Sequence, residues 1–308
     1  MRKYNGIRTF KRVKGGNFMK KAELIITGDW HLTETVPLCR TDDFISAQWK
    51  KVDFVKQMQE DLKCDVFHSG DLYDFWKPSP HLLSETIKHI PAQFYTVWGN
   101  HDLPQHSFAL RNKSGIYTLA QAGALTALEE GSWNYYTPEN NKEGFTLGMW
   151  LEKSNRIKQL IGIQHVFIYH GQKPWASCEA DSALSFMKKN PGMDLILTGD
   201  NHMSFVVTRK NQILVNPGSL TRRTASQIDY EPCVYIYYNN HTVEKVVLPY
   251  EKDVISREHL QQTEEKEKRI QAFISSLKDD DLDEISFEDN LELFFEANNV
   301  KEPVKQLI

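Results

Sequence analysis

Five short segments built from Gly, Asp, His and Asn constrain this chain of 308 residues more than any other feature of its sequence. Each follows a short run of apolar, β-branched or aromatic residues, the pattern of a buried strand that ends in a tight turn. The segments are residues 28–31, 70–71, 99–102, 169–171 and 199–202. Open α/β sheets bind their ligands beyond the carboxyl ends of their strands. The pattern therefore predicts an α/β fold with polar side chains placed at those ends.

The residue types in these segments are those of a metal site. Asp, His and Asn supply the oxygen and imidazole ligands that divalent metals prefer, and the adjacent Gly residues let the backbone turn sharply. A single Gly-Asp or His-Gly pair occurs by chance, so unrelated turns are the alternative interpretation. Five segments in order, each after an apolar run, favour the metal site.

The order of the motifs resembles that of the calcineurin-like metallophosphoesterases: Asp-x-His, Gly-Asp, Gly-Asn-His-Asp, His and Gly-x-x-His. Residues 70–74 (Gly-Asp-Leu-Tyr-Asp) and 216–220 (Asn-Pro-Gly-Ser-Leu) resemble more narrowly the SbcD-type DNA repair nucleases of bacteria and phages. The resemblance covers residues 19–248. It implies a four-layer α/β fold of two mixed β-sheets, packed face to face and flanked by helices, with a small helical C-terminal appendage.

The same resemblance implies a site for two divalent metal ions, with Mn²⁺ expected first and Mg²⁺ or others as alternatives. Metal one would be held by Asp29, His31, Asp71 and His202, and metal two by Asp71, Asn100, His170 and Asp200. The implied reaction is phosphodiester hydrolysis with a hydroxide bridging the two metals. In it, His101 would donate to the phosphate or the leaving oxygen, and Asp102 would fix the tautomer of His101.

Two positions of this set have alternatives. His170 stands at the end of an apolar run and directly before Gly171, so we take it as the ligand and interpret His165 as structural. Asp200 stands where the family pattern has His. Because a carboxylate is a hard ligand, it would favour Mn²⁺ or Mg²⁺, and loss of the second metal is the competing interpretation.

Four residues are candidates for substrate contacts. Arg222 and Arg223 could bind phosphate, or lie in a solvated loop. Tyr73 and Trp76 follow the second motif in a loop that also holds Phe75, and such aromatic residues could stack on bases, or pack within their loop. Asp74 stands where relatives often have a His that is tied to exonuclease action, which leaves that activity open.

Composition divides the chain into three parts. Residues 1–18 carry six Lys or Arg and no acidic residue, and could be a leader that precedes a natural start at Met19, or a basic DNA-contacting arm. Residues 19–249 hold the motifs and form the expected catalytic domain. Residues 250–308 are acidic, with helical patterns over 257–277 and 280–297 that predict a partner-docking segment. The near-neutral charge of the middle part restricts any DNA contact to a local patch and the metals.

Helical periodicity also predicts helices over 44–62, 79–90, 114–122 and 182–189, and alternation predicts strands over 205–208, 212–216, 234–238 and 243–248. No apolar stretch approaches the length of a membrane span. The four cysteines are far apart in the sequence and form no CxxC pair, which favours a reduced, cytoplasmic setting.

These features lead to one principal hypothesis and two alternatives. The principal one is a metal-dependent DNA exo- or endonuclease subunit of an SbcCD-like complex, bound through its C-terminal segment to an SMC-like ATPase and paired with a second copy as a homodimer. The first alternative is a stand-alone phosphatase or small-molecule phosphodiesterase of the same fold. The second is a catalytically weak scaffold.

Overall fold

The computed structural model describes residues 20–128, 147–153, 157–258, 265–271, 287–298 and 300. The basic segment 1–18 lies outside these residues. The chain divides into two compact units. The first unit consists of Met1–Val36, Asp43–Arg222 and Asp229–Glu251 and contains both β-sheets.

The first sheet has six strands in the order β11-β10-β1-β2-β3-β4. Strands β1, β2, β3 and β4 are parallel, β10 pairs antiparallel with β1, and β11 pairs antiparallel with β10. Because these strands are parallel, the loops that follow β1, β2 and β3 all leave the sheet at the same end. The bounds are β1 Ala22–Thr27, β2 Asp65–His68, β3 Phe94–Thr96, β4 Thr126–Ala127, β10 Cys233–Tyr238 and β11 Thr242–Val247.

The second sheet has five strands in the order β5-β6-β7-β9-β8. Strands β6, β7 and β9 are parallel, whereas β5 and β8 pair antiparallel at the two edges. The loops after β6 and β7 therefore leave the sheet at the same end. The bounds are β5 Leu147–Lys153, β6 Ile157–Gln164, β7 Leu195–Thr198, β8 Phe205–Arg209 and β9 Gln212–Asn216.

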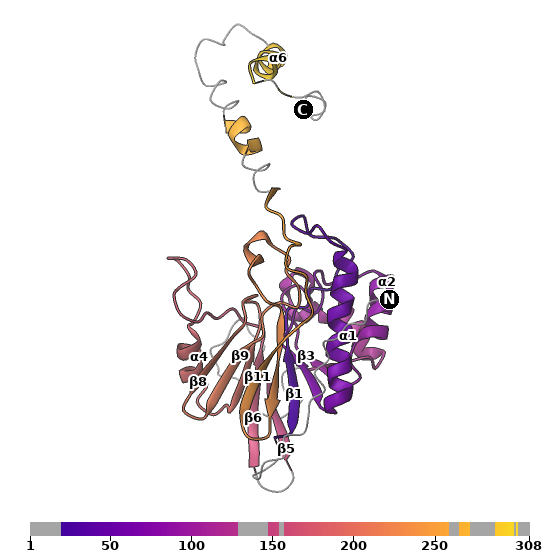
Figure 1. The fold of residues 1–308 in the computed structure, drawn as a ribbon, viewed down its shortest axis with the longest axis vertical. Helices are drawn as coiled ribbons and strands as arrows, with labels where there is room; N and C mark the ends of the chain where they lie inside the picture. The colour runs from indigo at the N-terminus through magenta and orange to yellow at the C-terminus, as the bar shows by residue number, and fades with distance from the viewer. Residues whose placement is uncertain are drawn as a thin grey trace. The chain divides into compact units, whose positions relative to one another are not determined.

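The two sheets pack face to face. One buried cluster joins Ile26 and Phe67 of the first sheet to Ile163, Leu197 and other residues of the second. Helices cover the outer faces (Figure 1). On the first sheet these are α1 Phe44–Leu62, α2 Pro80–His89 and α3 Gly115–Gln121, and on the second α4 Ala183–Lys189. The predicted fold of two mixed sheets between helices is confirmed.

Side-chain caps fix where the helices begin. Asp43 accepts a hydrogen bond from the backbone N–H of Ser46 at the start of α1, and Ser79, Ser114 and Ser182 cap α2, α3 and α4 in the same way. Such caps satisfy backbone donors that have no partner within the helix. The helices expected from periodicity are therefore confirmed to within one residue at most ends. Two 3₁₀ helices, Pro104–His106 and Phe108–Lys113, precede α3.

The second unit consists of Pro37–Asp42, Arg223–Ile228 and Lys252–Ile308. An isolated bridge joins Arg40 to Ile255, and a 3₁₀ helix spans Ala225–Gln227. Residues 265–271 are helical, and α6 spans Phe287–Ala297. The expected C-terminal helices are present in these described parts, while their role in docking a partner stays a prediction. Among the described residues, no helix is both long and apolar enough to cross a membrane.

The packing between the sheets should account for a large share of the stability. Leu197 is fully buried between them, so Leu197→Ala should lower the free energy of unfolding by about 2–5 kcal/mol. Leu184 on α4 is 48% exposed, and Leu184→Ala should change the free energy of unfolding by less than about 0.5 kcal/mol. Urea unfolding of both variants measures the difference, and equal losses would contradict this account of the core.

Candidate metal centre

Four of the five motifs lie beyond the carboxyl ends of strands from the two sheets, whereas residues 169–171 follow an irregular segment. Asp29 and His31 follow β1, Asp71 follows β2, and Asp200 follows β7. All four have left-handed backbones, with φ of 48°, 45°, 56° and 68° in that order. This conformation is uncommon outside glycine and costs free energy, so it persists where surrounding structure enforces it, as at functional sites. The strand ends thus hold the side chains in fixed, strained turns.

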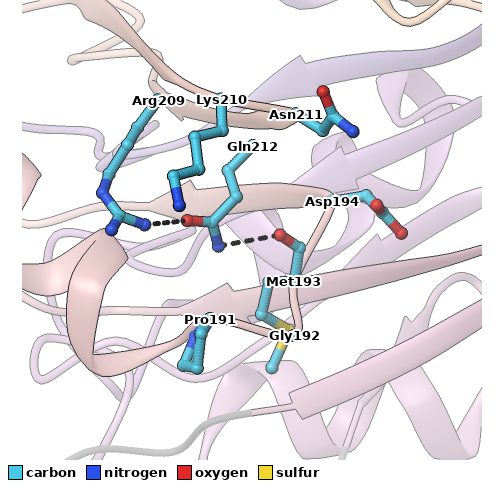
Figure 2. A pocket seen from close by; sticks show the side chains of 8 residues that line it. All are labelled: Pro191, Gly192, Met193, Asp194, Arg209, Lys210, Asn211 and Gln212. Atoms are coloured by element: carbon cyan, nitrogen blue, oxygen red, sulfur yellow. Dashed lines mark hydrogen bonds between the residues drawn. The ribbon is translucent and has the colours of Figure 1, made fainter.

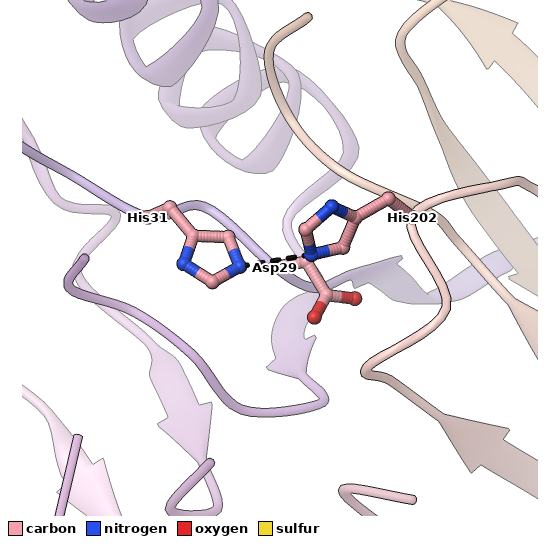
Figure 3. A group of neighbouring side chains, drawn as sticks. All are labelled: Asp29, His31 and His202. Atoms are coloured by element: carbon pink, nitrogen blue, oxygen red, sulfur yellow. Dashed lines mark hydrogen bonds between the residues drawn. The ribbon is translucent and has the colours of Figure 1, made fainter. Parts of the chain in front are cut away.

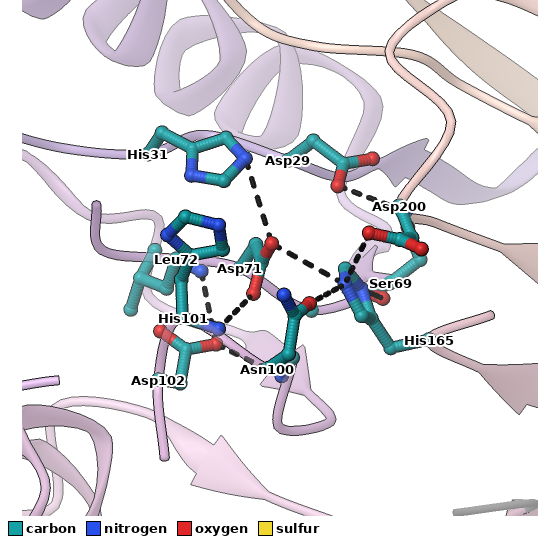
Figure 4. A network of polar contacts seen from close by, with 12 residues as sticks. Asp29, His31, Ser69, Asp71, Leu72, Asn100, His101, Asp102, His165 and Asp200 are labelled. Atoms are coloured by element: carbon teal, nitrogen blue, oxygen red, sulfur yellow. Dashed lines mark hydrogen bonds and ion pairs between the residues drawn. The ribbon is translucent and has the colours of Figure 1, made fainter. Parts of the chain in front are cut away.

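The carboxylate of Asp71 lies between two imidazoles at the centre of the group. Its Oδ2 atom is 3.5 Å from Nε2 of His31 and 3.3 Å from Nε2 of His165 (Figure 4). Asp71 is 1% exposed, so its charge is shielded from water. One carboxylate therefore faces two sets of ligand atoms, each drawn from loops of both sheets.

The first set consists of Asp29, His31 and His202 (Figure 3). Nε2 of His31 is 3.1 Å from Nε2 of His202. Two imidazole nitrogens bound about 2.0–2.1 Å from one metal would be about 2.9–3.4 Å apart at octahedral to tetrahedral angles. The buried Oδ2 atom of Asp29 has no hydrogen-bond partner among the described residues, although Oδ1 accepts from the backbone N–H of Asp200. These donors fit a divalent cation.

The second set surrounds His165. Its Nε2 atom is 3.0 Å from Oδ1 of Asn100 and 3.9 Å from Oδ1 of Asp200, in addition to the contact with Asp71 (Figure 4). Its Nδ1–H donates to the carbonyl of Ser69 over 2.8 Å, which holds the ring with Nε2 toward the oxygens. Such a carbonyl contact on the far nitrogen is usual for metal-binding histidines.

His165 occupies the place that the sequence analysis assigned to His170. Strand β6 ends at Gln164, so His165 is the first residue after it, and the apolar run 166–169 is an irregular segment with one bridge at Tyr169. His170 is exposed, and its ring lies beside Phe205 at 5.8 Å between centroids. The assignment of His165 as structural is thereby corrected. The alternating apolar residues Ile161 and Ile163 indicate a strand that ends directly before His165.

The electrostatics of the group favour a cation. Burial and the charge of Asp71 act in opposite directions on His165, and the carboxylate prevails, raising the pKa of the imidazole to about 10. Burial also opposes ionisation of Asp71, but the imidazoles of His165, His31 and His101 hold the pKa of its carboxyl well below the usual range. Burial raises the pKa of Asp29 well above its ordinary value. Positive charge, whether proton or metal, is therefore stabilised between these carboxylates.

His101 lies at the edge of the centre with its ring exposed. The ring contacts His31 edge to face, 4.8 Å between centroids, and its Nδ1–H donates to the backbone carbonyl of Asp74 over 2.9 Å. Its backbone N–H donates to Oδ1 of Asp71 over 2.9 Å. His101 also places a ring nitrogen within 4.8 Å of ligand atoms of His31 and Asp71, and its expected role toward the phosphate or the leaving oxygen stays a prediction.

Asp102 does not fix the tautomer of His101. Its buried carboxylate accepts three backbone hydrogen bonds, from Leu72, Tyr73 and Gly99, at 3.0–3.2 Å. Burial, followed by the charge of Asp71, raises the pKa of Asp102 to about 7. Asp102 therefore joins the loop after β2 to the loop after β3. The backbone carbonyl of Asp74, and not Asp102, fixes the tautomer of His101.

Two of the four predicted substrate contacts are turned into the protein. Tyr73 is 1% exposed and its hydroxyl donates to Thr86. Arg222 is 2% exposed, with its guanidinium over the ring of Tyr250 and donating to the carbonyl of Glu251. Neither is presented to a substrate, because both are buried and engaged in contacts within the protein.

The other two predicted substrate contacts keep that role only as a prediction. Trp76 is half-buried and its ring lies 5.4 Å from that of Phe75, between centroids. Arg223 belongs to the second unit, where its backbone N–H donates to Gln227.

Residues 216–220 support the loop that carries His202. The amide of Asn216 donates to the carbonyls of Asn201 and Met203, and the backbone N–H of Ser219 donates to the carbonyl of His202. Gly218 has φ +72°, and a Cβ there would lie 2.8 Å from the carbonyl oxygen of His202. A side chain at this position would push the loop away from the centre.

The chain belongs to the calcineurin-like phosphoesterase superfamily, whose domain model matches residues 23–236. The family and the clustered side chains together support a metal-dependent hydrolase of phosphoester bonds. The chain matches no curated protein sequence.

Solved structures with a similar fold include an archaeal phosphodiesterase that is 14% identical in sequence. The match covers 75% of this chain and 100% of the archaeal chain, with a TM-score of 0.40. A predicted phosphoesterase from Streptococcus pneumoniae TIGR4 is 14% identical, covering 78% of this chain and 98% of its own, with a TM-score of 0.35. Vacuolar Protein Sorting 29 from Cryptosporidium parvum is 16% identical, covering 76% and 99%, with a TM-score of 0.35.

Substitution of the two competing histidines should separate their roles. His165→Ala should weaken Mn²⁺ binding by more than about 100-fold, beyond the effect of losing an outer contact of a metal site. His170→Ala should leave the affinity within about twofold. Mn²⁺ at 100 times its Kd should stabilise the wild type and His170→Ala by about 2.7 kcal/mol, measured by thermal unfolding with and without the metal. Loss of Mn²⁺ binding in His170→Ala but not in His165→Ala would instead identify His170 as the metal ligand.

Proposed function

We propose that this protein is a metal-dependent DNA nuclease, the catalytic subunit of an SbcCD-like repair or recombination complex. The observation that carries the hydrolytic part is the buried carboxylate of Asp71 between two sets of ligands. The nuclease assignment is supported by the motifs at 70–74 and 216–220, which resemble those of SbcD-type subunits. Such a nuclease would act in the cytoplasm, and Mn²⁺ is the first candidate metal.

Asp29, His31, Asp71 and His202 would hold one metal, and Asp71, Asn100, His165 and Asp200 the other. When bound, a metal pair of this kind neutralises charge on the phosphate oxygens and acidifies water. His101 is held by the carbonyl of Asp74, and as an imidazolium it would donate its Nε2 proton to the leaving oxygen. Asp102 keeps the loops that carry these groups together.

The partners follow from the same proposal. Two catalytic domains would pair as a homodimer, and the acidic C-terminal segment 250–308 would dock an SMC-like ATPase. Helix α6 carries Leu293, which is 51% exposed and could contribute to such docking. DNA is the expected substrate.

Three substrates distinguish this function from its alternatives. Purified protein with Mn²⁺, alone and with a candidate coiled-coil ATPase partner, is tested on linear DNA, hairpin DNA and bis-p-nitrophenyl phosphate. A nuclease should cut DNA, and more efficiently with the ATPase. Hydrolysis of the small ester without any cutting of DNA would instead favour a stand-alone phosphodiesterase, and inactivity on all three would favour a scaffold.

Asp200 decides whether the second metal set is complete. Its carboxylate is 38% exposed and faces His165, so Asp200→Ala should abolish Mn²⁺-dependent hydrolysis of bis-p-nitrophenyl phosphate. Asp200→His replaces an oxygen ligand with the imidazole found in the family pattern, and should retain activity with a preference shifted toward softer metals. Unchanged turnover in Asp200→Ala would remove this residue from the site.

A further inference from the structure

A cavity of about 240 Å³ adjoins the metal centre. One wall is formed by residues 32–35, which follow β1, and the other by residues of the loop 74–79 and by Leu82, at the start of α2. A backbone hydrogen bond from Asp74 to Leu32 ties the two walls together. The cavity is therefore part of the framework that carries the first two metal motifs.

Asp74 connects this cavity to the reacting groups. It lines the cavity, its carboxylate lies 3.7 Å from Nδ1 of His31, and its carbonyl accepts the Nδ1–H of His101. Leu32, which also lines the cavity, is the residue after His31. A phosphodiester held at the centre would thus have one of its two ester groups beside this cavity.

The lining favours a neutral, planar group. Glu34 and Asp74 outnumber the single cation Lys77, so the walls do not attract a second phosphate. Phe75 is 58% exposed, with Trp76 5.4 Å away between ring centroids, and offers an open aromatic surface. Pockets for drug-sized ligands are about 300–1,000 Å³, so this smaller cavity suits one nucleoside.

A larger hollow of about 610 Å³ does not compete for this role. Its lining residues precede β7 and form the turn between β8 and β9 (Figure 2). This is the end of the second sheet opposite the carboxyl end of β7, which the metal motif at 199–202 follows. Two of the hollow's polar side chains are engaged within the protein: Arg209 donates to Gln212, and Gln212 donates to the carbonyls of Asn190 and Met193. Nothing there points to a ligand.

We propose that the cavity beside Asp74 binds the nucleoside next to the scissile phosphate, with its base stacked on Phe75. The inference rests on the proposed function, because it requires a nucleic-acid phosphodiester at the metal centre. Phe75, which is exposed, takes the stacking role that the sequence suggests for Tyr73, whose ring is buried.

The test compares two diesters with the same leaving group, p-nitrophenol. One is the p-nitrophenyl ester of thymidine monophosphate and the other is methyl p-nitrophenyl phosphate. Phe75→Ala should lower kcat/KM for the thymidine ester by about five- to a hundred-fold, mainly through KM, and that for the methyl ester by much less. Trp175→Ala is the matched control, since Trp175 is 53% exposed on a different loop and does not line the cavity.

Equal losses on both esters, or an equal effect of Trp175→Ala on the thymidine ester, would overturn the inference. Binding without turnover tests it separately from the proposed function. A dinucleoside methylphosphonate, which is not hydrolysed, should shift the ring NMR signals of Phe75 in the full chain and lose affinity in Phe75→Ala. If neither ester is hydrolysed, the proposed function fails, and these NMR shifts alone decide whether the cavity binds a nucleoside.

Discussion

The buried carboxylate of Asp71 is the interaction on which the rest of this structure depends. Removing a carboxylate from water costs several kcal/mol unless cations or hydrogen bonds compensate, and here His31, His165 and the backbone N–H of His101 surround it. His31 comes from the first sheet and His165 from the second. The charge of one residue therefore links the carboxyl ends of both sheets.

Close backbone packing makes this arrangement possible. At Gly99 a Cβ would lie 2.0 Å from Oδ1 of Asp71, so a side chain there would displace the carboxylate. Asp102, three residues later, accepts hydrogen bonds from the loops after β2 and β3 and holds them at this short separation. Gly28, Gly70, Gly99 and Gly199 thus allow loops to approach closely, and the acidic residues both bind charge and join those loops.

Several site residues could be predicted because the chemistry and the strand pattern agree. Asp29, His31, Asp71, Asn100, Asp200 and His202 all follow strands, and the structure brings their side chains into one network. The choice between His165 and His170 failed because the apolar run 166–169 resembles a strand but forms none, while β6 ends just before His165. Tyr73 and Arg222 look suited to substrate contacts until their burial is known.

The sequence by itself determined the class of fold, the order of the motifs and the kinds of ligand, since these depend on local hydrophobic pattern and on residue chemistry. Only the tertiary structure decided which histidine faces Asp71, that Asp102 holds loops and not an imidazole, and that a cavity with Phe75 on its wall adjoins the centre. The physical reason is that side-chain burial and long-range hydrogen bonds depend on how separate loops pack. No local pattern records that packing.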